Sequence, residues 1–302
     1  MAIRDLYQVD AFTTELFAGN PAGVVLNAEG LDDHTMLSLA NELNNSETAF
    51  VFPKQEGYDL EVRFFTPHEE VPLCGHATIA AHVVLYHATG NRTGTFLMKT
   101  KAGILPVEVQ KEGDEVVVTL TQGPIAFGPL LSKKQTKTLI KGLGIQMDDL
   151  DNSLPLQIVS TGYGKVMIPL LRKSVLDTLS VDHVLLAKLS KEISCNGFYA
   201  FTFDAAQPGS LVSGRMFAPR SNIKEDPVTG NANGPLGAYL TRYGRLEKRR
   251  DGISFSIVQG EAMGRKGCMQ VQVYSSETEP VLVKISGKAR IVFHATLDVL
   301  EV

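Results

Sequence analysis

The sequence predicts an α+β protein of two similar domains, each a curved, mostly antiparallel sheet wrapped around one central helix. Two observations carry this prediction. The two halves of the chain contain similar motifs in the same order, which is typical of a duplicated domain. Within each half, short apolar runs typical of strands alternate with longer runs typical of helices. A length of 302 residues is also that of about two domains.

Three pairs of motifs carry the repeat. The first half contains Ala-Phe-Val-Phe from Ala49, Arg-Phe-Phe-Thr-Pro from Arg63 and Gly-His-Ala from Gly75. Their counterparts in the second half, which read Ala-Phe-Thr-Phe, Arg-Met-Phe-Ala-Pro and Gly-Asn-Ala, begin at Ala200, Arg215 and Gly230. The same order at similar intervals indicates duplication of the whole unit.

The first half is predicted to alternate strands and helices along its length. The alanine-rich run that begins at Gly75 has no polar face, so it predicts a central helix buried on all sides. Period-two alternation on both sides of Lys111-Glu112-Gly113-Asp114 is typical of a hairpin. The predicted elements are strands at 7–12, 23–26, 49–53 and 60–65, an amphipathic helix at 31–44, the central helix to residue 86, and hairpin strands at 104–110 and 115–121.

The second half is predicted to follow the same plan. Its elements are helices at 133–142 and 182–193, strands at 199–203 and 211–217, a central helix at 231–243, and strands at 254–259, 269–274 and 281–293. Residues 122–129 contain two glycines and two prolines, which favours a connector between domains. We therefore expect one domain at 1–121, to which a strand at 286–302 returns, and a second at 129–285.

Composition excludes several classes of function. Twenty-nine basic and 33 acidic residues give a net charge of −4, whereas nucleic-acid and anionic-membrane surfaces need a basic excess. No apolar run approaches the roughly 18 residues of a membrane span. Charged residues near the N-terminus argue against a signal peptide, and three cysteines without a CxxC motif argue against a disulfide scaffold. We therefore expect a cytoplasmic protein without nucleic-acid or membrane partners.

The two central helices each begin at a glycine that could approach a ligand closely. Gly75 precedes His76 and Ala77, and Gly230 precedes Asn231 and Ala232, so the residues at these two helix starts are candidates for substrate binding. A helix N-terminus presents unpaired backbone N–H groups and partial positive charge, which favours binding of a carboxylate. Equally, both glycines could simply make tight turns between strand and helix.

Two carboxylates are candidates for acid/base chemistry. Glu47 precedes an apolar strand, and Asp226 stands four residues before Gly230. At the mouth of an apolar cleft the charged form of a carboxyl is disfavoured, which raises its pKa toward the range useful for proton transfer. The alternatives are a solvated turn residue for Glu47 and a cap or turn residue for Asp226. His76 could act as an acid, a base or a donor, or could be a satisfied turn residue.

No metal or cofactor is expected. On a helix, His82 is rotated by about 240° from His76, and His87 lies about 16 Å further along the axis, so the three histidines cannot converge. The chain also lacks the glycine-rich motifs of nucleotide sites and the GxSxG motif of α/β-hydrolases. The functions that these absences leave open are a cofactor-free acid/base enzyme and a binding protein.

Five segments, in order along nearly the whole chain, resemble the phenazine-biosynthesis-like (PhzF-like) isomerases. They read Gly-Asn-Pro-Ala-Gly-Val (19–24), Ser-Glu-Thr-Ala-Phe (46–50), Arg-Phe-Phe-Thr-Pro (63–67), Leu-Cys-Gly-His-Ala-Thr (73–78) and Glu-Asp-Pro-Val-Thr-Gly (225–230). The resemblance implies the diaminopimelate epimerase fold, with an active site in the cleft between two domains. It also raises a homodimer as an option.

The resemblance implies roles for individual residues. Glu47 corresponds to the proton-shuttling acid/base, Gly75 and His76 to a pair that binds substrate and positions a proton, and Asp226 to the acid of the Glu-Asp-Pro motif. Asn231 departs from the serine common in the family, which leaves the substrate open.

The epimerase relatives implied by the same resemblance use two facing thiols, one at each helix start. Here Cys74 stands at the first position but Thr229 at the second, and a hydroxyl is too weak an acid to replace a thiol. We therefore expect Cys74 to be a buried small residue and Glu47 to act as a single base.

The sequence therefore predicts an isomerase, independent of cofactors, that moves a proton between carbons of a small carboxylate-bearing substrate, amino-acid-like or cyclic. Glu47, His76 and Asp226 are the predicted catalytic residues. Two alternatives stay open, namely a non-catalytic ligand- or protein-binding member of the same fold and a one-thiol amino-acid racemase.

Overall fold

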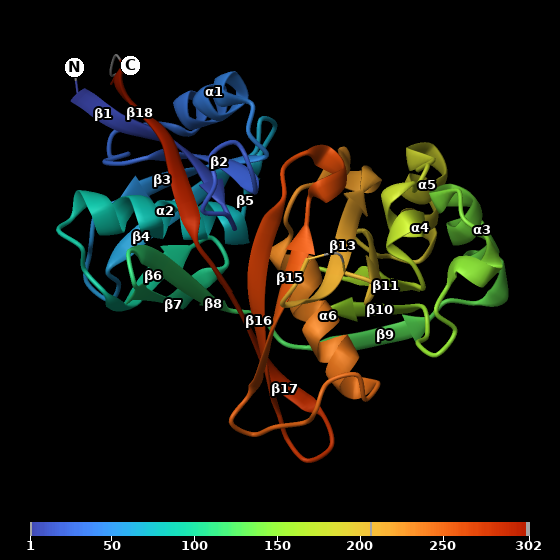
Figure 1. Ribbon diagram of the computed structural model, residues 1–302. Helices are drawn as coiled ribbons and strands as arrows, with labels where there is room; N and C mark the ends of the chain where they lie inside the picture. The colour runs from blue at the N-terminus through green and yellow to red at the C-terminus, as the bar shows by residue number, and fades with distance from the viewer. Residues whose placement is uncertain (1, 206, 300–302) are drawn as a thin grey trace. The chain divides into compact units, whose positions relative to one another are not determined.

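A computed structural model describes residues 2–205 and 207–299 of the chain (Figure 1). It divides into two compact units. The first comprises the chain up to Leu120 and from Ser286 onward, and the second comprises Thr121–Ile285. Each unit is a curved, mostly antiparallel sheet around one helix, so the predicted fold class is confirmed. None of the described helices is both long and apolar enough to span a membrane.

The first unit is built around α2 (Gly75–Ala88). The other elements are β1 (Ala2–Ala11), β2 (Asn20–Val25), α1 (Asp33–Leu43), β3 (Glu47–Phe52), β4 (Leu60–Phe65), β5 (Glu70–Val71), β6 (Gly94–Thr100), β7 (Gly103–Glu112), β8 (Glu115–Thr121) and β18 (Ala289–Val299). Ten of the helix's residues are buried, because strands β1, β2, β3 and β18 contact it (Figure 1). A helix that is apolar all round is stable only in such a setting.

Helix α1 packs on the other face of this sheet, against β3 and β4. It begins where the Asp32 side chain accepts a hydrogen bond from the Thr35 backbone N–H at 2.8 Å, and it ends at Asn44, whose φ of 51° is left-handed. Met36 and Ala40 face the sheet and are buried. The amphipathic helix predicted at 31–44 is therefore present, with ends fixed by ordinary caps.

The second unit is built in the same way around α6 (Gly230–Arg242), which contacts β10, β11 and β16. A Cβ on Gly237 would lie 2.8 Å from the side chains of Val271 and Val273, so this glycine lets helix and sheet approach closely. The other elements are β9 (Ala126–Leu130), α3 (Lys133–Leu143), β10 (Gln157–Ser160), β11 (Lys165–Leu170), α4 (Lys173–Asp177), α5 (His183–Glu192), β12 (Phe198–Thr202), β13 (Ser210–Ala218), β14 (Ile223–Asp226), β15 (Ile253–Gln259), β16 (Gly267–Ser275) and β17 (Pro280–Gly287), with short 3₁₀ turns at 147–149, 219–221 and 261–263.

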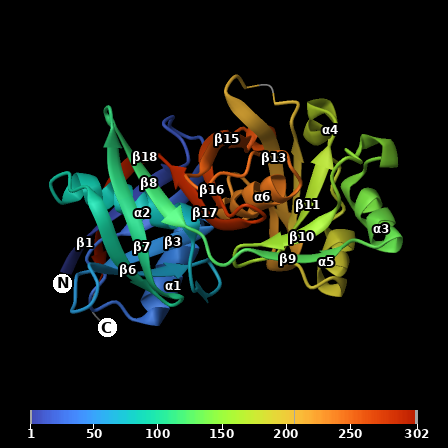
Figure 2. The same cartoon turned by 90° about the horizontal axis from the view of Figure 1, so that it is seen from below.

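Helices α3 and α5 pack against each other in the second unit (Figure 2). Their leucines join residues of β11 and β12 in one apolar cluster that includes Leu139, Leu186 and Val166. Each unit therefore has three layers: the central helix, the sheet, and outer helices on the opposite face.

The duplication predicted from the motifs is visible in the strand pairing. β2 and β3 are parallel, as are β11 and β12, and the next strand is antiparallel in both units. Arg63 forms a two-point ion pair with Glu70 at 2.9 and 3.1 Å. Arg215 forms the same pair with Glu225 at 2.8 Å. In both units the arginine also lies over the ring of the phenylalanine two residues on.

Part of the predicted connector is a strand. β9 (Ala126–Leu130) pairs with β10, with Phe127 opposite Val159 and Leu130 opposite Gln157. The register shifts between these pairs, so Gly128 and Pro129 form an irregularity that needs no regular ladder hydrogen bonds. Gly128 and Pro129, which predicted a linker, therefore lie at an irregularity within a strand pair.

The run predicted as one strand at 281–293 is two strands. β17 ends at Gly287 and β18 begins at Ala289. Between them the Lys288 carbonyl accepts from the Phe12 backbone N–H at 2.7 Å. β18 then pairs antiparallel with β1. Residues 300–302, the end of the predicted returning strand, lie outside the described residues. Six elements were not predicted from the sequence, namely β5, β6, β10, β11, β14 and α4.

His82 is buried inside the first unit. Its Nδ1 donates to the Thr78 carbonyl at 2.9 Å, while its Nε2 has no hydrogen-bond partner among the described residues. Burial disfavours the imidazolium and lowers the pKa of His82 from 6.5 to about 4. His82 is thus a neutral core residue.

We predict that this residue makes the protein acid-sensitive. Between pH 6.5 and 4 the unfolded chain protonates His82 and the folded chain does not, so the free energy of unfolding falls as pH falls, by about 3 kcal/mol in all. Denaturant unfolding at pH 7 and pH 4.5 would show a smaller loss for His82→Leu than for the wild type. An equal loss in both proteins would contradict the prediction.

Candidate active site

Glu47 is the first residue of β3 and lies opposite Ala22 of β2 in a parallel pair. Its side chain is 17% exposed. The strand that follows is apolar and buried, so the carboxylate stands at the boundary between the core of the first unit and its surface. A rigid strand therefore fixes the position of this acid.

Three side chains surround the Glu47 carboxylate. His76, in the first turn of α2, places its Nε2 atom 3.5 Å from Glu47 Oε2 and 3.1 Å from Ser46 Oγ. Cys74, the residue before the helix, places its Sγ atom 3.3 Å from His76 Nδ1. His76 and Cys74 are both buried. The structure thus brings together two of the three predicted catalytic residues.

Burial is the main influence on the Glu47 carboxyl, and it raises its pKa. Hydrogen bonds from Ser46 and Cys74 act in the opposite direction because they favour the charged form. Burial outweighs these hydrogen bonds, so the pKa of Glu47 lies above its ordinary value.

The same cluster is the one group of potential metal ligands among the described residues. Donor atoms of Glu47, Cys74 and His76 all lie within 4.8 Å of one another. The three histidines weighed in the sequence do not form a group: His82 bonds to the backbone of its own helix.

Asp226 ends β14 in the second unit, so it belongs to a different unit from Glu47 and His76. Its Oδ2 atom accepts a hydrogen bond from the Thr229 hydroxyl. Thr229 is the residue before α6 and the counterpart of Cys74 in the repeat. Its hydroxyl proton is therefore committed to Asp226, consistent with the expectation that it does not replace a thiol.

Gln259 connects the groups beneath this helix start. Its Nε2 atom donates to Thr229 Oγ1 at 3.1 Å and to the Asp226 carbonyl at 2.8 Å. Its Oε1 atom accepts from the Thr229 backbone N–H at 3.2 Å and from Asn233 Nδ2 at 3.0 Å. Tyr199 donates to Asn233 Oδ1 at 2.5 Å. The side-chain amides of Gln259 and Asn233 both use their two N–H groups as donors, so the direction of each bond is fixed. The series ends at Asp226 Oδ2, which accepts from the Thr229 hydroxyl.

Lys165, the first residue of β11, is almost fully buried. Burial lowers its pKa to about 8, and the nearby Cys195 and Asp226 act in the opposite direction by favouring the ammonium. Its Nζ atom lies 5.8 Å from the centre of the Tyr163 ring. The amine is thus a second titratable group in the neighbourhood of Asp226.

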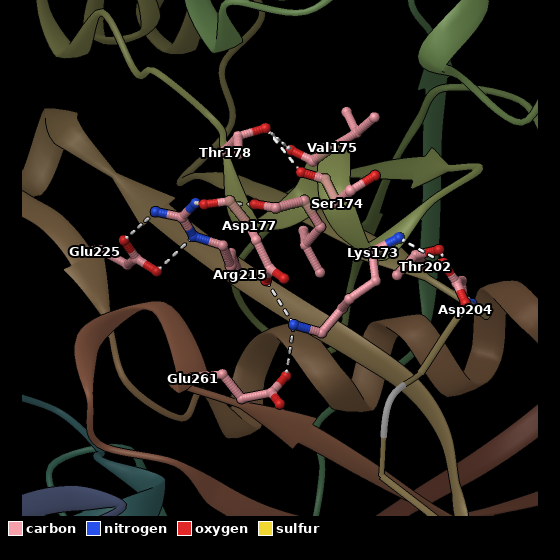
Figure 3. A network of polar contacts seen from close by, with 11 residues as sticks. Lys173, Ser174, Val175, Asp177, Thr178, Thr202, Asp204, Arg215, Glu225 and Glu261 are labelled. Atoms are coloured by element: carbon pink, nitrogen blue, oxygen red, sulfur yellow. Dashed lines mark hydrogen bonds and ion pairs between the residues drawn. The ribbon is translucent and has the colours of Figure 1, made fainter.

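An ion-pair network holds the strand that carries Asp226 (Figure 3). Arg215 of β13 forms two hydrogen bonds to Glu225, the residue before Asp226. It also donates to the Leu176 carbonyl at 2.9 Å. Lys173 bonds Asp177 at 2.5 Å and Glu261 at 3.1 Å, as Figure 3 shows. Two-point arginine–carboxylate contacts fix orientation as well as distance.

The candidate substrate-binding residues lie at the two helix starts, as predicted. Gly75 and Ala77 are in the first turn of α2, and Gly230, Asn231 and Ala232 are in the first turn of α6. Asn231 is exposed, whereas Gly230 and Ala232 are buried. The Ala232 backbone N–H donates to the Thr229 carbonyl at 3.2 Å, so it is engaged within the turn.

Sequence reasoning missed several residues around these sites. Ser46 was part of a quoted motif, but only the structure shows its contact with His76. Gln259, Asn233 and Tyr199 are single polar residues in apolar surroundings without a motif, so nothing in their spacing indicated a network. Lys165 gave one signal, a lysine at the head of an apolar strand.

Comparison with known proteins places the chain among isomerases. The family model described as phenazine biosynthesis-like protein (PhzC-PhzF) matches residues 9–295. An uncharacterized isomerase of Clostridium acetobutylicum is 50% identical over 97% of each chain. The trans-2,3-dihydro-3-hydroxyanthranilate isomerase of Pseudomonas fluorescens is 30% identical over 92% of this chain and 94% of that one.

Solved structures agree with the sequence comparison. A PhzF-family phenazine biosynthesis protein of Bacillus anthracis superposes with a TM-score of 0.90 over 99% of this chain and all of that one, at 30% identity. A hydroxyproline epimerase of Agrobacterium vitis superposes with a TM-score of 0.64 over 98% of this chain and 91% of that one, at 13% identity. The second likeness concerns the fold alone.

We predict that Gln259 is essential to the order of the second helix start. Gln259→Leu leaves the Thr229 N–H and the Asn233 amide without their acceptor, and should lower the free energy of unfolding by at least about 2 kcal/mol. Gln270→Leu, at an exposed position, is the control and should cost less than about 0.5 kcal/mol. Urea unfolding measures both; similar small losses would show that the network contributes nothing.

Proposed function

This chain belongs to the phenazine biosynthesis-like (PhzC-PhzF) family, and we propose that it is a cofactor-independent isomerase that moves a proton between two carbons of one substrate. Glu47 takes the proton from an activated carbon and returns it to another. The substrate is a small, carboxylate-bearing molecule, amino-acid-like or cyclic. The observation that carries the proposal is the convergence of Glu47 with His76, Ser46 and Cys74 at the start of α2.

The cluster suits a single-base proton shuttle. Glu47 is held on a strand and His76 on a helix, so the 3.5 Å between them depends on rigid elements and not on a loop. As the carboxylate gains and loses a proton, the imidazole and the Ser46 hydroxyl can exchange donor and acceptor roles with it. Neither partner has to move for the shuttle to work.

The start of α2, where His76 lies, has a role of its own in the proposal. The His76 ring lies at the N-terminus of α2, where backbone N–H groups and the helix dipole favour negative charge. We assign to this helix start, through Gly75 and Ala77, the stabilisation of charge that develops on the substrate as the proton leaves.

For the second unit we assign to Asp226 the binding of a polar substituent of the substrate. Asp226 Oδ2 accepts a hydrogen bond from the Thr229 hydroxyl, as a charged carboxylate does. Such a carboxylate can also accept a hydrogen bond from an amine or hydroxyl of the substrate. Gly230 and Asn231 begin a helix whose N-terminus suits a carboxylate.

The relatives support this substrate class. Several are named isomerases, and one is named for trans-2,3-dihydro-3-hydroxyanthranilate, a cyclic molecule with a carboxylate and an amino group. The names also weigh against a non-catalytic binding protein.

A one-thiol racemase is the second candidate, and one observation favours it. The Cys74 thiol lies 3.3 Å from the His76 ring, close enough for the imidazole to take its proton. Against it, Thr229 occupies the matching position of the second unit, and its proton is donated to Asp226. We therefore rank the shuttle through Glu47 first.

The proposal predicts that Glu47→Gln abolishes proton exchange. In heavy water, wild-type protein incubated with trans-2,3-dihydro-3-hydroxyanthranilate and a panel of small amino acids should incorporate deuterium at carbon of at least one compound. The glutamine variant keeps the shape but cannot carry a proton, so its rate should fall about a hundredfold or more. NMR or mass spectrometry of the recovered compounds measures incorporation.

Glu42→Gln is the control, because Glu42 is exposed on α1 of the same unit. It should exchange at the wild-type rate. Wild-type exchange in Glu47→Gln would refute the assignment of Glu47. Binding of a compound without exchange in any variant would support the non-catalytic alternative.

A further inference from the structure

We propose that Glu47, Cys74 and His76 also form a three-ligand site for a zinc-like divalent transition metal, and that the metal inhibits the enzyme reversibly. The inhibitory part rests on the proposed function, because it supposes that Glu47 must be able to carry a proton. The binding part does not.

The three donor atoms lie close enough together for one ion to contact them after a local side-chain adjustment. Bonds of about 2.0–2.3 Å from zinc to nitrogen, oxygen and sulfur require donor atoms about 3.3–3.6 Å apart. His76 Nε2 lies 3.5 Å from Glu47 Oε2 and 4.0 Å from Cys74 Sγ. All three donor atoms lie within 4.8 Å of one another. The Cys74 thiol now lies nearer to His76 Nδ1, at 3.3 Å, so a rotation of the Cys74 side chain toward Nε2 would complete one face of the tetrahedron.

Rigid parts of the first unit hold all three ligands. Glu47 begins β3, and His76 lies in the first turn of α2. Cys74 has extended backbone angles, with φ −138° and ψ 120°, just before the helix begins. This extended residue allows the side chains of two near neighbours in sequence to face one another, which the spacing of histidines along a helix could not predict.

The donor types select the kind of ion. Thiolate and imidazole favour zinc, cobalt and similar ions over magnesium and calcium, which prefer oxygen ligands. Three protein ligands leave a fourth position for water or another small ligand. On binding, the Cys74 thiol gives its proton to solvent and coordinates as thiolate.

Inhibition follows from the choice of ligands. A metal ion bonded to the Glu47 carboxylate occupies one of its oxygens and lowers the basicity of the other, so the group no longer accepts the substrate's proton effectively. A bound ion would therefore stop proton exchange, and a chelator would restore it.

Cobalt is the probe for binding, because a thiolate bound to Co²⁺ gives a charge-transfer absorption band. Wild-type protein treated with chelator should develop this band with one equivalent of Co²⁺, and Zn²⁺ should abolish it. Cys74→Ser should show no band, and His76→Gln should bind at least about tenfold more weakly. Far-ultraviolet circular dichroism establishes that each variant is folded.

Cys268→Ser is the matched control, because Cys268 is an exposed thiol of the second unit. This variant should keep the full band. A band that persists in Cys74→Ser, a band lost in Cys268→Ser, or no band in the wild type would each overturn the proposed site.

Activity provides the second measurement. Zn²⁺ should block deuterium exchange by the wild type and by Cys268→Ser at the concentrations that displace cobalt. A cobalt band that depends on Cys74, in a protein without exchange activity, would uphold the metal site and refute the proposed function. Exchange that continues with zinc bound would overturn the inhibitory part alone.

Discussion

The carboxylate of Glu47 is removed from most of its water, and the arrangement of the first unit follows from that constraint. A carboxylate can be buried only where donors replace its lost hydration. Ser46 and Cys74 supply hydrogen bonds to it, and the His76 ring lies 3.5 Å away at the start of α2. The central helix is in turn apolar on every side and is stable because four strands contact it. The position of the Glu47 carboxylate therefore depends on the packing of the sheet against the central helix.

The second unit keeps the frame of the first and changes its chemistry. Both units preserve the arginine–glutamate pair that pins the hairpin before the central helix. The residues at the two helix starts differ, with Cys74 and His76 in one and Thr229 and Asn231 in the other. The cluster of Glu47, Cys74 and His76 in the first unit is replaced in the second by a directed set of amide and hydroxyl bonds that ends on Asp226. Duplication thus reproduced the scaffold, while each copy acquired its own polar groups.

The sequence was sufficient for the architecture because periodicity reports which faces are buried. The alanine-rich run from Gly75 has no polar face and so predicted a central helix, and the repeated motifs predicted its partner from about residue 231. The residues missed are those whose meaning depends on contacts distant in sequence. Pro129 was taken for part of a linker because a bulge in an irregular strand pair has the composition of a loop. Glu47 and His76 were named together through the family resemblance, whereas Gln259 has significance only through the four bonds it makes.

In the proposed reaction, one carboxylate carries one proton from carbon to carbon within a single molecule. The direct measurement uses a substrate labelled with deuterium at the donor carbon and turned over in ordinary water. We expect some product molecules to retain the deuterium at the acceptor carbon. Complete loss of the label, with protium delivered to the opposite face of the original carbon, would contradict it and identify a racemase.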